Sequence, residues 1–203
     1  MVEIVCFGDS NTFGFNPRNG KRYDENTRWS GILSCKLKDK FKVIEAGCNN
    51  RTCYSINPES DELTGFRALP KYLKPTTSYL ILAVGLNDLQ KYYSSNDYEI
   101  KEGIINLIEI SRKISPQIKI IILAPSKIKI NILNSYFAIL FDEKSIEKSI
   151  KMNEIYRKVA QENNCELINL DNEVETSEID GLHYLEEEHK KIAEIIINTC
   201  FKF

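Results

Sequence analysis

Three short polar segments of the chain carry residue types that are used in acyl-transfer chemistry. They are Gly8-Asp9-Ser10-Asn11, Gly85-Leu86-Asn87-Asp88 and Asp180-Gly181-Leu182-His183. A serine hydroxyl is a poor nucleophile until a neighbouring base removes its proton, and histidine is the usual base. An aspartate beside that histidine holds the imidazole in the tautomer that can accept the serine proton. The pattern therefore favours Ser10 as a nucleophile, His183 as its base and Asp180 as the group that orients His183.

The sequence offers few histidines from which to choose the base. Only two are present, His183 and His189. Asp180 precedes His183 by three residues, a spacing that places both side chains on one side of a helical turn. His189 lies in the charged helical segment 186–191, so we expect it to be exposed. The alternative interpretation of His183 is a structural histidine or one half of a helix N-terminal pair.

The oxyanion of a tetrahedral intermediate needs hydrogen-bond donors that are already in position, and each is worth roughly 10²–10³ in rate. The Ser10 backbone N–H, the Asn87 side-chain amide and one N–H from the loop near Asn50 can supply them. A simpler interpretation makes Asn87 a turn residue and the polar residues around Ser10 the cap of the next helix. The joint presence of a serine, an amide and Asp-x-x-His favours the catalytic interpretation.

Strand-like apolar runs precede most of these polar segments. The runs are Ile4–Phe7, Phe41–Ala46, Ser78–Val84, Ile118–Ala124 and Cys165–Leu170. Several are continuously apolar, as expected for strands covered on both faces. Their alternation with helical segments predicts an α/β fold: a three-layer α/β/α sandwich with a five-stranded parallel sheet in the flavodoxin-like order 2-1-3-4-5. Ser10, Asn50 and Asn87 each follow a strand, so this topology brings them to the carboxyl edge, where such sheets bind ligands.

Apolar residues with helical spacing mark the helices between these strands. The stripes begin at Trp29, Ile100, Ile146 and Ile192, and a weaker helix is expected over 62–72. Two loops, 16–28 and 125–144, are longer than packing needs, and loops of that length usually have a function. The second holds an apolar-aromatic stretch, 128–141, that suits a pocket wall, a lid or a subunit contact. We expect this stretch and three aromatic residues to shape the substrate pocket: Phe13, Tyr92 and Tyr93.

The composition is that of an ordinary globular protein. The chain has 203 residues, 42% of them hydrophobic and 28% charged, with a formal net charge of −2. This length fits a single domain over 1–203, and the balanced charge argues against a nucleic-acid partner. We find no signal peptide and no run near the roughly 18 apolar residues of a membrane helix. Six cysteines without a Cys-x-x-Cys pair indicate reduced thiols, so we expect a cytoplasmic protein. Whether it forms a homo-oligomer stays open.

The polar segments together resemble the SGNH, or GDSL-type, family of ester hydrolases. The first, third and last blocks of that family match the three segments named above, in the same order along the chain. The segments 13–17, 28–29 and 43–47 are further similar to the branch that contains arylesterases and acetyl-transferring esterases. The resemblance implies a sandwich fold and a serine esterase without a cofactor, acting on small-molecule esters and transferring the acyl group to water or to another alcohol. It also implies that Ser10 is the nucleophile and that Asp180 and His183 form the orienting and basic pair.

The chain departs from the family pattern in the second block. The family usually places a glycine or another small residue there, as a backbone donor to the oxyanion. Spacing from the second strand puts Asn50 at that position, and Gly47 is the alternative. Asparagine keeps the backbone N–H and tolerates left-handed dihedral angles better than most residues. We therefore expect Asn50 to supply the donor.

Two other kinds of site remain open from the residues alone. A flavodoxin-like module could bind a phosphate or nucleotide through N–H groups after Ser10, but the chain lacks the glycine-rich phosphate-binding motifs. A metal-dependent hydrolase could use Asp9, Asp88, Asp180 and His183. A catalytic zinc site would normally require more histidines or more closely clustered ligands.

Overall fold

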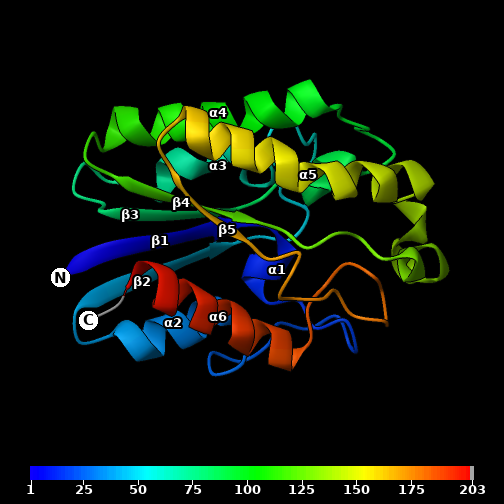
Figure 1. Ribbon diagram of the computed structural model, residues 1–203, viewed down its shortest axis with the longest axis horizontal. Helices are drawn as coiled ribbons and strands as arrows, with labels where there is room; N and C mark the ends of the chain where they lie inside the picture. The colour runs from blue at the N-terminus through cyan, green and yellow to red at the C-terminus, as the bar shows by residue number, and fades with distance from the viewer. Residues whose placement is uncertain (202–203) are drawn as a thin grey trace.

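The computed structural model describes residues 1–201, and its centre is a parallel sheet (Figure 1). The strands are β1 (Val2–Gly8), β2 (Phe41–Gly47), β3 (Tyr79–Ala83), β4 (Lys119–Ala124) and β5 (Glu166–Asn169). Their order is β2-β1-β3-β4-β5, and every neighbouring pair is parallel. The predicted fold class and strand order are confirmed.

Helices cover both faces of the sheet, as Figure 1 shows. On one face lie α2 (Trp29–Leu37) and α6 (Glu186–Cys200), and on the other lie α3 (Gly65–Ala68), α4 (Asp97–Ile114) and α5 (Glu143–Glu162). Successive side chains of a strand point to opposite faces. Val5 and Phe7 therefore belong to the core under α4 and α5, whereas Ile4 and Cys6 belong to the core under α2 and α6. Burial on both faces explains the continuously apolar strand runs.

Side-chain caps fix where the two longest helices begin. Asn96 caps α4 by accepting from the backbone N–H of Glu99, whose side chain accepts from the Asn96 N–H in return. Asp142 caps α5 in the same way together with Ser145. Such reciprocal caps satisfy backbone donors that a helix start leaves without partners. The loop expected over 125–144 therefore ends at Asp142, and its last two residues belong to α5.

The weak helix expected over 62–72 is broken into short pieces. It consists of the 3-10 turn η1 (Asp61–Leu63), the single-turn helix α3 and the 3-10 turn η2 (Leu69–Lys71). Pro70 lies in η2 and has no backbone N–H, so a regular helix does not continue through it. Three further short elements surround the carboxyl edge of the sheet: α1 (Ser10–Phe13) and the 3-10 turns η3 (Leu86–Leu89) and η4 (Ile130–Asn134). A fourth, η5 (Tyr136–Ile139), follows η4 in the 125–144 loop.

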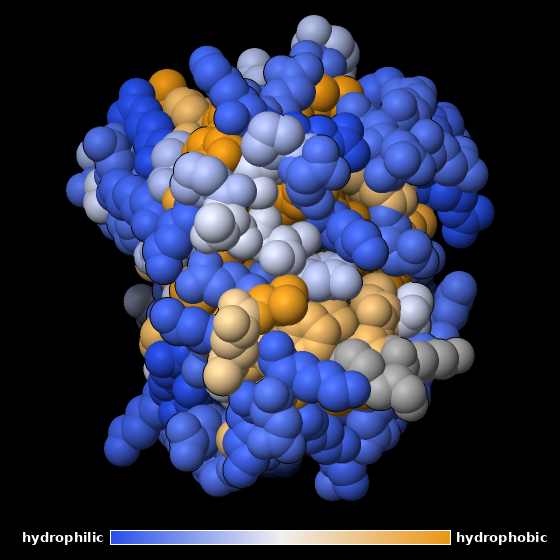
Figure 2. All heavy atoms as spheres, turned by 90° about the vertical axis from the view of Figure 1, so that its left-hand side faces the viewer, coloured by the Kyte–Doolittle hydropathy of each residue, from blue (hydrophilic) through white to orange (hydrophobic). Residues whose placement is uncertain are grey.

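The two ends of the sheet differ in character. Figure 2 shows the face at the left of Figure 1, where the strands begin: it is largely hydrophilic, with a smaller band of apolar atoms. The three polar segments lie at the opposite end, because every strand runs the same way. No helix within residues 1–201 is both long enough and apolar enough to cross a bilayer.

Candidate active site

Ser10 is presented at the carboxyl end of β1, as the first residue of α1. Asp9 caps this helix, and its Oδ1 accepts from the Asn11 backbone N–H at 2.9 Å. The tight turn depends on Gly8, because a Cβ there would lie 2.0 Å from Thr12 Oγ1 and 2.4 Å from the Ala83 carbonyl oxygen. Burial raises the pKa of Asp9 to about 7, against the lowering effects of the Asn11 N–H and Arg51. The capping interpretation and the nucleophile interpretation of this segment are therefore compatible.

The segment 180–183 brings a carboxylate and an imidazole to Ser10. His183 Nε2 lies 2.9 Å from Ser10 Oγ, and His183 Nδ1 lies 2.7 Å from Asp180 Oδ2. The other carboxylate oxygen, Oδ1, accepts from the backbone N–H groups of Leu182 and His183, both at 3.0 Å. Burial favours the protonated carboxyl, but the hydrogen bond and charge of His183 outweigh it and lower the pKa of Asp180 to about 2. Asp180 therefore stays ionised at neutral pH. Its Oδ2 orients the imidazole, and its Oδ1 holds the backbone of the same turn.

Two phenylalanine rings cover the imidazole of His183. The Phe15 ring centroid lies 4.3 Å from that of His183, at an interplanar angle of 32°, and the Phe137 centroid lies 5.0 Å away. Beside them is a cavity of about 110 Å³, and its lining residues come from segments far apart in the sequence. They are Ser10, Phe15, Asn49, Asn50, Asn87, Phe137, Phe141, Leu182 and His183. The serine and histidine thus face a small pocket with aromatic walls.

Both asparagines that were predicted to serve the oxyanion line this cavity. Asn87 lies in η3, and its Nδ2 donates to the Arg51 carbonyl oxygen at 3.0 Å, which leaves its second N–H for another acceptor. Asn50 has the left-handed φ of 61°, and its backbone N–H has no hydrogen-bond partner within residues 1–201. Gly47 ends β2 under α1, where a Cβ would lie 2.2 Å from the Phe13 nitrogen, and it does not line the cavity.

The carboxylate of Asp88, one of the ligands that a metal site would use, is engaged by the backbone of a neighbouring loop. Asp88 is buried, and its carboxylate accepts from the backbone N–H groups of Cys53, Tyr54 and Ser55 at 2.6, 3.0 and 2.8 Å. These bonds hold the 51–55 loop against η3. In the part of the chain that the structure describes, no group of three or more histidines, cysteines and carboxylates is placed to hold a metal ion.

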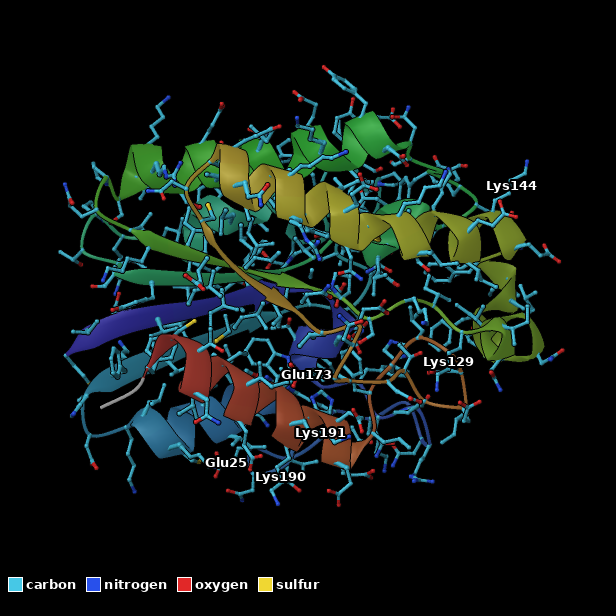
Figure 3. All side chains as sticks on the ribbon, viewed as in Figure 1. Glu25, Lys129, Lys144, Glu173, Lys190 and Lys191 are labelled. Carbon is cyan, nitrogen blue, oxygen red and sulfur yellow. The ribbon has the colours of Figure 1, made fainter. Side chains whose placement is uncertain are left out.

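The prediction that His189 is exposed is wrong. Its side chain is buried, its Nδ1 accepts from the Trp29 backbone N–H at 3.4 Å, and its ring contacts those of Tyr23 and Tyr184. Burial lowers its pKa to about 3, with a further contribution from His183. Figure 3 shows Lys190 and Lys191 on the outward side of α6, so the charged run is a solvated helix face from which His189 alone turns inward.

The aromatic residues expected to shape the pocket are only partly the right ones. Phe137 and Phe141 come from the expected stretch 128–141, but Phe13, Tyr92 and Tyr93 do not line the cavity. Phe13 packs beneath the guanidinium of Arg22, and the Tyr92 side chain is 77% exposed. Phe15 takes the place expected of Phe13, and no feature of the sequence distinguishes these two aromatic residues.

The loop 125–144 is fastened to the segment that carries His183. The Lys129 backbone N–H donates to the Gly181 carbonyl oxygen at 2.8 Å. Gly181 has a φ of +70°, and a Cβ there would lie 2.6 Å from the Lys129 carbonyl oxygen. The Lys129 ammonium also contacts Glu175 and Glu178, and Figure 3 shows Lys129 beside the chain that leads to this turn. The loop therefore forms a wall of the pocket and supports the turn.

A second fixed contact joins two segments that resemble the arylesterase branch. The Arg28 guanidinium binds both carboxylate oxygens of Glu45 at 2.6 Å, and Ser30 Oγ donates to the same carboxylate at 2.6 Å. A bidentate pair of this kind adds geometric specificity. It holds the end of the 16–28 loop against β2, close to the start of the 47–50 turn.

Comparison with known proteins identifies the family. Residues 6–190 match the model of the GDSL-like lipase/acylhydrolase family. The chain belongs to this family. The GDSL-like chain is also similar to the crystal structure of Est24, a carbohydrate acetylesterase from Sinorhizobium meliloti, with 26% identity, a TM-score of 0.90 and coverage of 98% of this chain and 97% of that one. The inhibitor-bound aryl esterase of M. smegmatis is 25% identical, with a TM-score of 0.86 and coverage of 98% and 99%. The comparison with curated proteins found no match.

Family membership decides between the kinds of function that the residues left open. The GDSL-like chain is a serine esterase that acts on carboxylic esters, and a phosphate- or nucleotide-binding module is not favoured. A catalytic serine, a histidine base and an oxyanion hole are typical of this family.

Proposed function

We propose that Ser10, His183 and Asp180 form the catalytic triad of this esterase and that it removes small acyl groups, acetyl above all, through an acyl-enzyme. The observation that carries the proposal is the continuous hydrogen-bonded line from Asp180 Oδ2 through the imidazole to Ser10 Oγ. This is the arrangement in which a carboxylate orients a histidine that can take the serine proton.

The reaction follows from this geometry. Ser10 Oγ attacks the ester carbonyl carbon while His183 Nε2 takes the serine proton. The resulting oxyanion accepts hydrogen bonds from the backbone N–H groups of Ser10 and Asn50 and from the Asn87 amide. When the ester C–O bond breaks, His183 returns its proton to the departing alcohol oxygen, and the acyl group stays on Ser10. A water molecule then attacks the acyl carbon, its proton passes to His183, and the carboxylic acid leaves as Ser10 regains its hydrogen. A second alcohol in place of water gives acyl transfer.

The size of the cavity supports a small acyl group. Its volume of about 110 Å³ is well below the ~300 Å³ at which pockets for drug-sized ligands begin. Phe137 and Phe141 close one side, so a longer acyl chain meets ring atoms. The similar structure from Sinorhizobium meliloti is that of a carbohydrate acetylesterase, which agrees with an acetyl ester as the substrate.

A cytoplasmic location is part of the same proposal. All six cysteines are free thiols, and Cys6 and Cys53 are buried. Free thiols persist where glutathione and thioredoxin keep them reduced. Fractionation of the source cells, with the chain detected by a specific antibody, tests the location; recovery from the extracellular medium would overturn it.

Labelling of the nucleophile tests the catalytic proposal directly. A fluorophosphonate reacts with a serine that a neighbouring base activates, so we expect one adduct, mapped by mass spectrometry to Ser10, together with loss of p-nitrophenyl acetate hydrolysis. Heat-unfolded protein is the control, because unfolding separates Ser10 from His183 and must abolish labelling. An adduct on another serine, or full activity in Ser10→Ala, would overturn the assignment. Retention of activity after dialysis against EDTA separates this mechanism from metal-dependent hydrolysis.

A further inference from the structure

The donor role proposed for Asn87 depends on which way its amide is turned. An asparagine side chain has nearly the same shape in two orientations that exchange the oxygen and the nitrogen. Only the orientation with Nδ2 towards the cavity can donate to an oxyanion. The reverse orientation would point a carbonyl dipole at the developing negative charge. The site therefore needs neighbouring groups that select one orientation of the Asn87 amide before the substrate binds.

Gln90 is placed to make that selection. Its Nε2 donates to Asn87 Oδ1 at 2.8 Å, and Asn87 Nδ2 in turn donates to the Arg51 carbonyl oxygen at 3.0 Å. Asn87 is 5% exposed and Gln90 is 7% exposed, so water does not readily replace either bond. A reversed Asn87 amide would face Nε2 of Gln90 with an N–H and the Arg51 carbonyl with an oxygen. With Gln90 in the orientation seen here, both hydrogen bonds would be lost at once.

We propose that Gln90 is a positioning residue for the reaction, one that fixes the oxyanion donor Asn87 in its productive orientation. The inference rests on the proposed function, because it assigns work to Gln90 only if Asn87 is a donor in the transition state. Gln90 does not line the cavity and does not touch the reacting atoms.

The local backbone explains why the two side chains meet. Asn87 and Gln90 are three residues apart, at η3 and its C-cap, and side chains at this spacing eclipse one another in a 3-10 turn. The Gln90 N–H donates to the Asn87 carbonyl oxygen at 3.2 Å, which closes the turn. The Gln90 carbonyl oxygen accepts from Tyr93 and Ser94, at 2.9 and 2.7 Å. Gln90 is thus held by its main chain while its side chain folds back over Asn87.

The second contact of the Asn87 amide, the Arg51 carbonyl, is also held in place. The buried Arg51 guanidinium donates to the carbonyl oxygens of Gly8 and Ala46, at the ends of β1 and β2, and to Glu62. It also lies over the Phe7 ring, 4.3 Å from the ring centroid. The Arg51 main chain therefore cannot follow a turning amide. Asn87 therefore lies between the Arg51 carbonyl, which can only accept, and the Gln90 amide nitrogen, which donates to it.

Two substitutions at position 90 remove the donor in different ways. Gln90→Leu keeps much of the volume and removes the hydrogen bond, and Gln90→Glu keeps the shape but places an acceptor against Asn87 Oδ1. We expect kcat for p-nitrophenyl acetate to fall roughly ten- to hundredfold in both, with KM nearly unchanged, because an orientation needed only in the transition state is lost. The matched control is Gln117→Leu, an exposed glutamine at the opposite end of the sheet, for which we expect the activity of the unchanged protein.

A double-mutant cycle with Asn87→Ala separates positioning from a general loss of stability. Asn87→Ala alone should lower kcat by roughly 10²–10³. In that background Gln90→Leu should cause no further loss, because no amide remains to be oriented. A merely structural role would lower kcat again. Should Gln90→Leu fail to fold, as judged by circular dichroism, Gln90→Glu takes its place in the cycle.

The outcomes distinguish this inference from the proposed function beneath it. If Asn87→Ala leaves kcat unchanged, the assignment of Asn87 as an oxyanion donor is overturned, and the role of Gln90 with it. If Asn87→Ala lowers kcat but the Gln90 variants do not, or if their effects add in the double variant, only the role of Gln90 is overturned.

Discussion

His183 Nε2 lies 2.9 Å from Ser10 Oγ, although 173 positions of sequence separate the two residues. A second contact nearby holds the same two segments together: Asn11 Nδ2 donates to the Leu182 carbonyl oxygen at 3.2 Å. The Trp29 indole N–H donates to the Asn11 carbonyl oxygen at 3.1 Å and braces α1 from the other side. The nucleophile and base are therefore in hydrogen-bonding contact before any substrate binds.

Asp180→Asn should lower kcat by roughly 10⁴-fold, the effect known for removing the carboxylate of a serine triad, while leaving the fold intact. Its remaining oxygen can still accept from the N–H groups of Leu182 and His183, which now hold Oδ1. The amide nitrogen would face His183 Nδ1 and favour the wrong tautomer. Hydrolysis of p-nitrophenyl acetate measures the loss, and an unchanged near-ultraviolet circular dichroism spectrum is the control. Activity within tenfold of the unchanged protein would contradict the orienting role.

Asn50→Gly should retain kcat within roughly tenfold, far from the 10²–10³ expected when one oxyanion donor is deleted. Glycine keeps the backbone N–H and adopts a φ of 61° without strain. The steady-state kcat of Asn50→Gly is compared with that of Asn87→Ala, because the two asparagines would donate through different atoms. A loss of 10²–10³ in Asn50→Gly would show that the Asn50 side chain, rather than its main chain, is the donor.

Phe137→Ala should shift the acyl preference towards longer chains. Removing this ring enlarges the cavity beside Ser10. We expect the ratio of kcat/KM for p-nitrophenyl butyrate to that for the acetate to rise by roughly tenfold, the order of selectivity that apolar pockets have for methylene groups. Because Phe137 also packs on His183, the ratio is a better measure than either rate. The control is Tyr136→Ala, a neighbouring ring that is 79% exposed and should leave the ratio unchanged.

His189 should make the fold less stable in acid. Its pKa is about 3 in the folded protein, against about 6.5 for an unperturbed histidine, so it stays neutral in the fold. Below pH ~6.5 the unfolded chain takes up a proton that the folded chain does not, and the free energy of unfolding therefore falls as the pH drops towards about 3. Urea denaturation, followed by the fluorescence of Trp29, the single tryptophan, measures this fall. In His189→Gln, which can still accept the Trp29 N–H, the fall should be smaller.

Asp9 changes the free energy of unfolding in the opposite direction with pH, over a range that overlaps that of His189. Its pKa is about 7 in the fold, so between about pH 4 and pH 7 folded Asp9 holds a proton that the unfolded chain has released. This contribution to stability is lost as the pH rises. The difference between the unchanged protein and His189→Gln cancels the Asp9 contribution, since both carry it. Equal slopes of unfolding free energy against pH in the two proteins would contradict the role given to His189.

The sheet order and the meeting of Ser10, Asn50, Asn87 and His183 could be predicted because both follow from strong constraints. Strands buried on both faces are continuously apolar, and parallel strands bring their carboxyl ends to one edge. The inward turn of His189 could not be predicted from its charged neighbours. Adjacent residues of a helix point about 100° apart, so one member of a charged run can face the core while the next two face water.

The aromatic residues of the pocket are a second feature that the sequence pattern could not predict. Phe13 and Phe15 flank Gly14, whose φ of 85° ends α1 in a left-handed turn. Beyond such a turn neither helical nor strand periodicity carries over, so the pattern does not say which ring faces His183. Gln90 was missed for a related reason. Its contact with Asn87 depends on a 3-10 turn, and the sequence did not distinguish that turn from an ordinary loop.

The hydrogen bond from Lys129 to Gly181 has a consequence for how the ester enters. The 125–144 segment cannot swing outward as a lid without pulling on the turn that holds the histidine against the serine. Any outward movement of the chain at Lys129 would therefore also shift this turn, so the position of the pocket wall and the alignment of His183 with Ser10 are coupled.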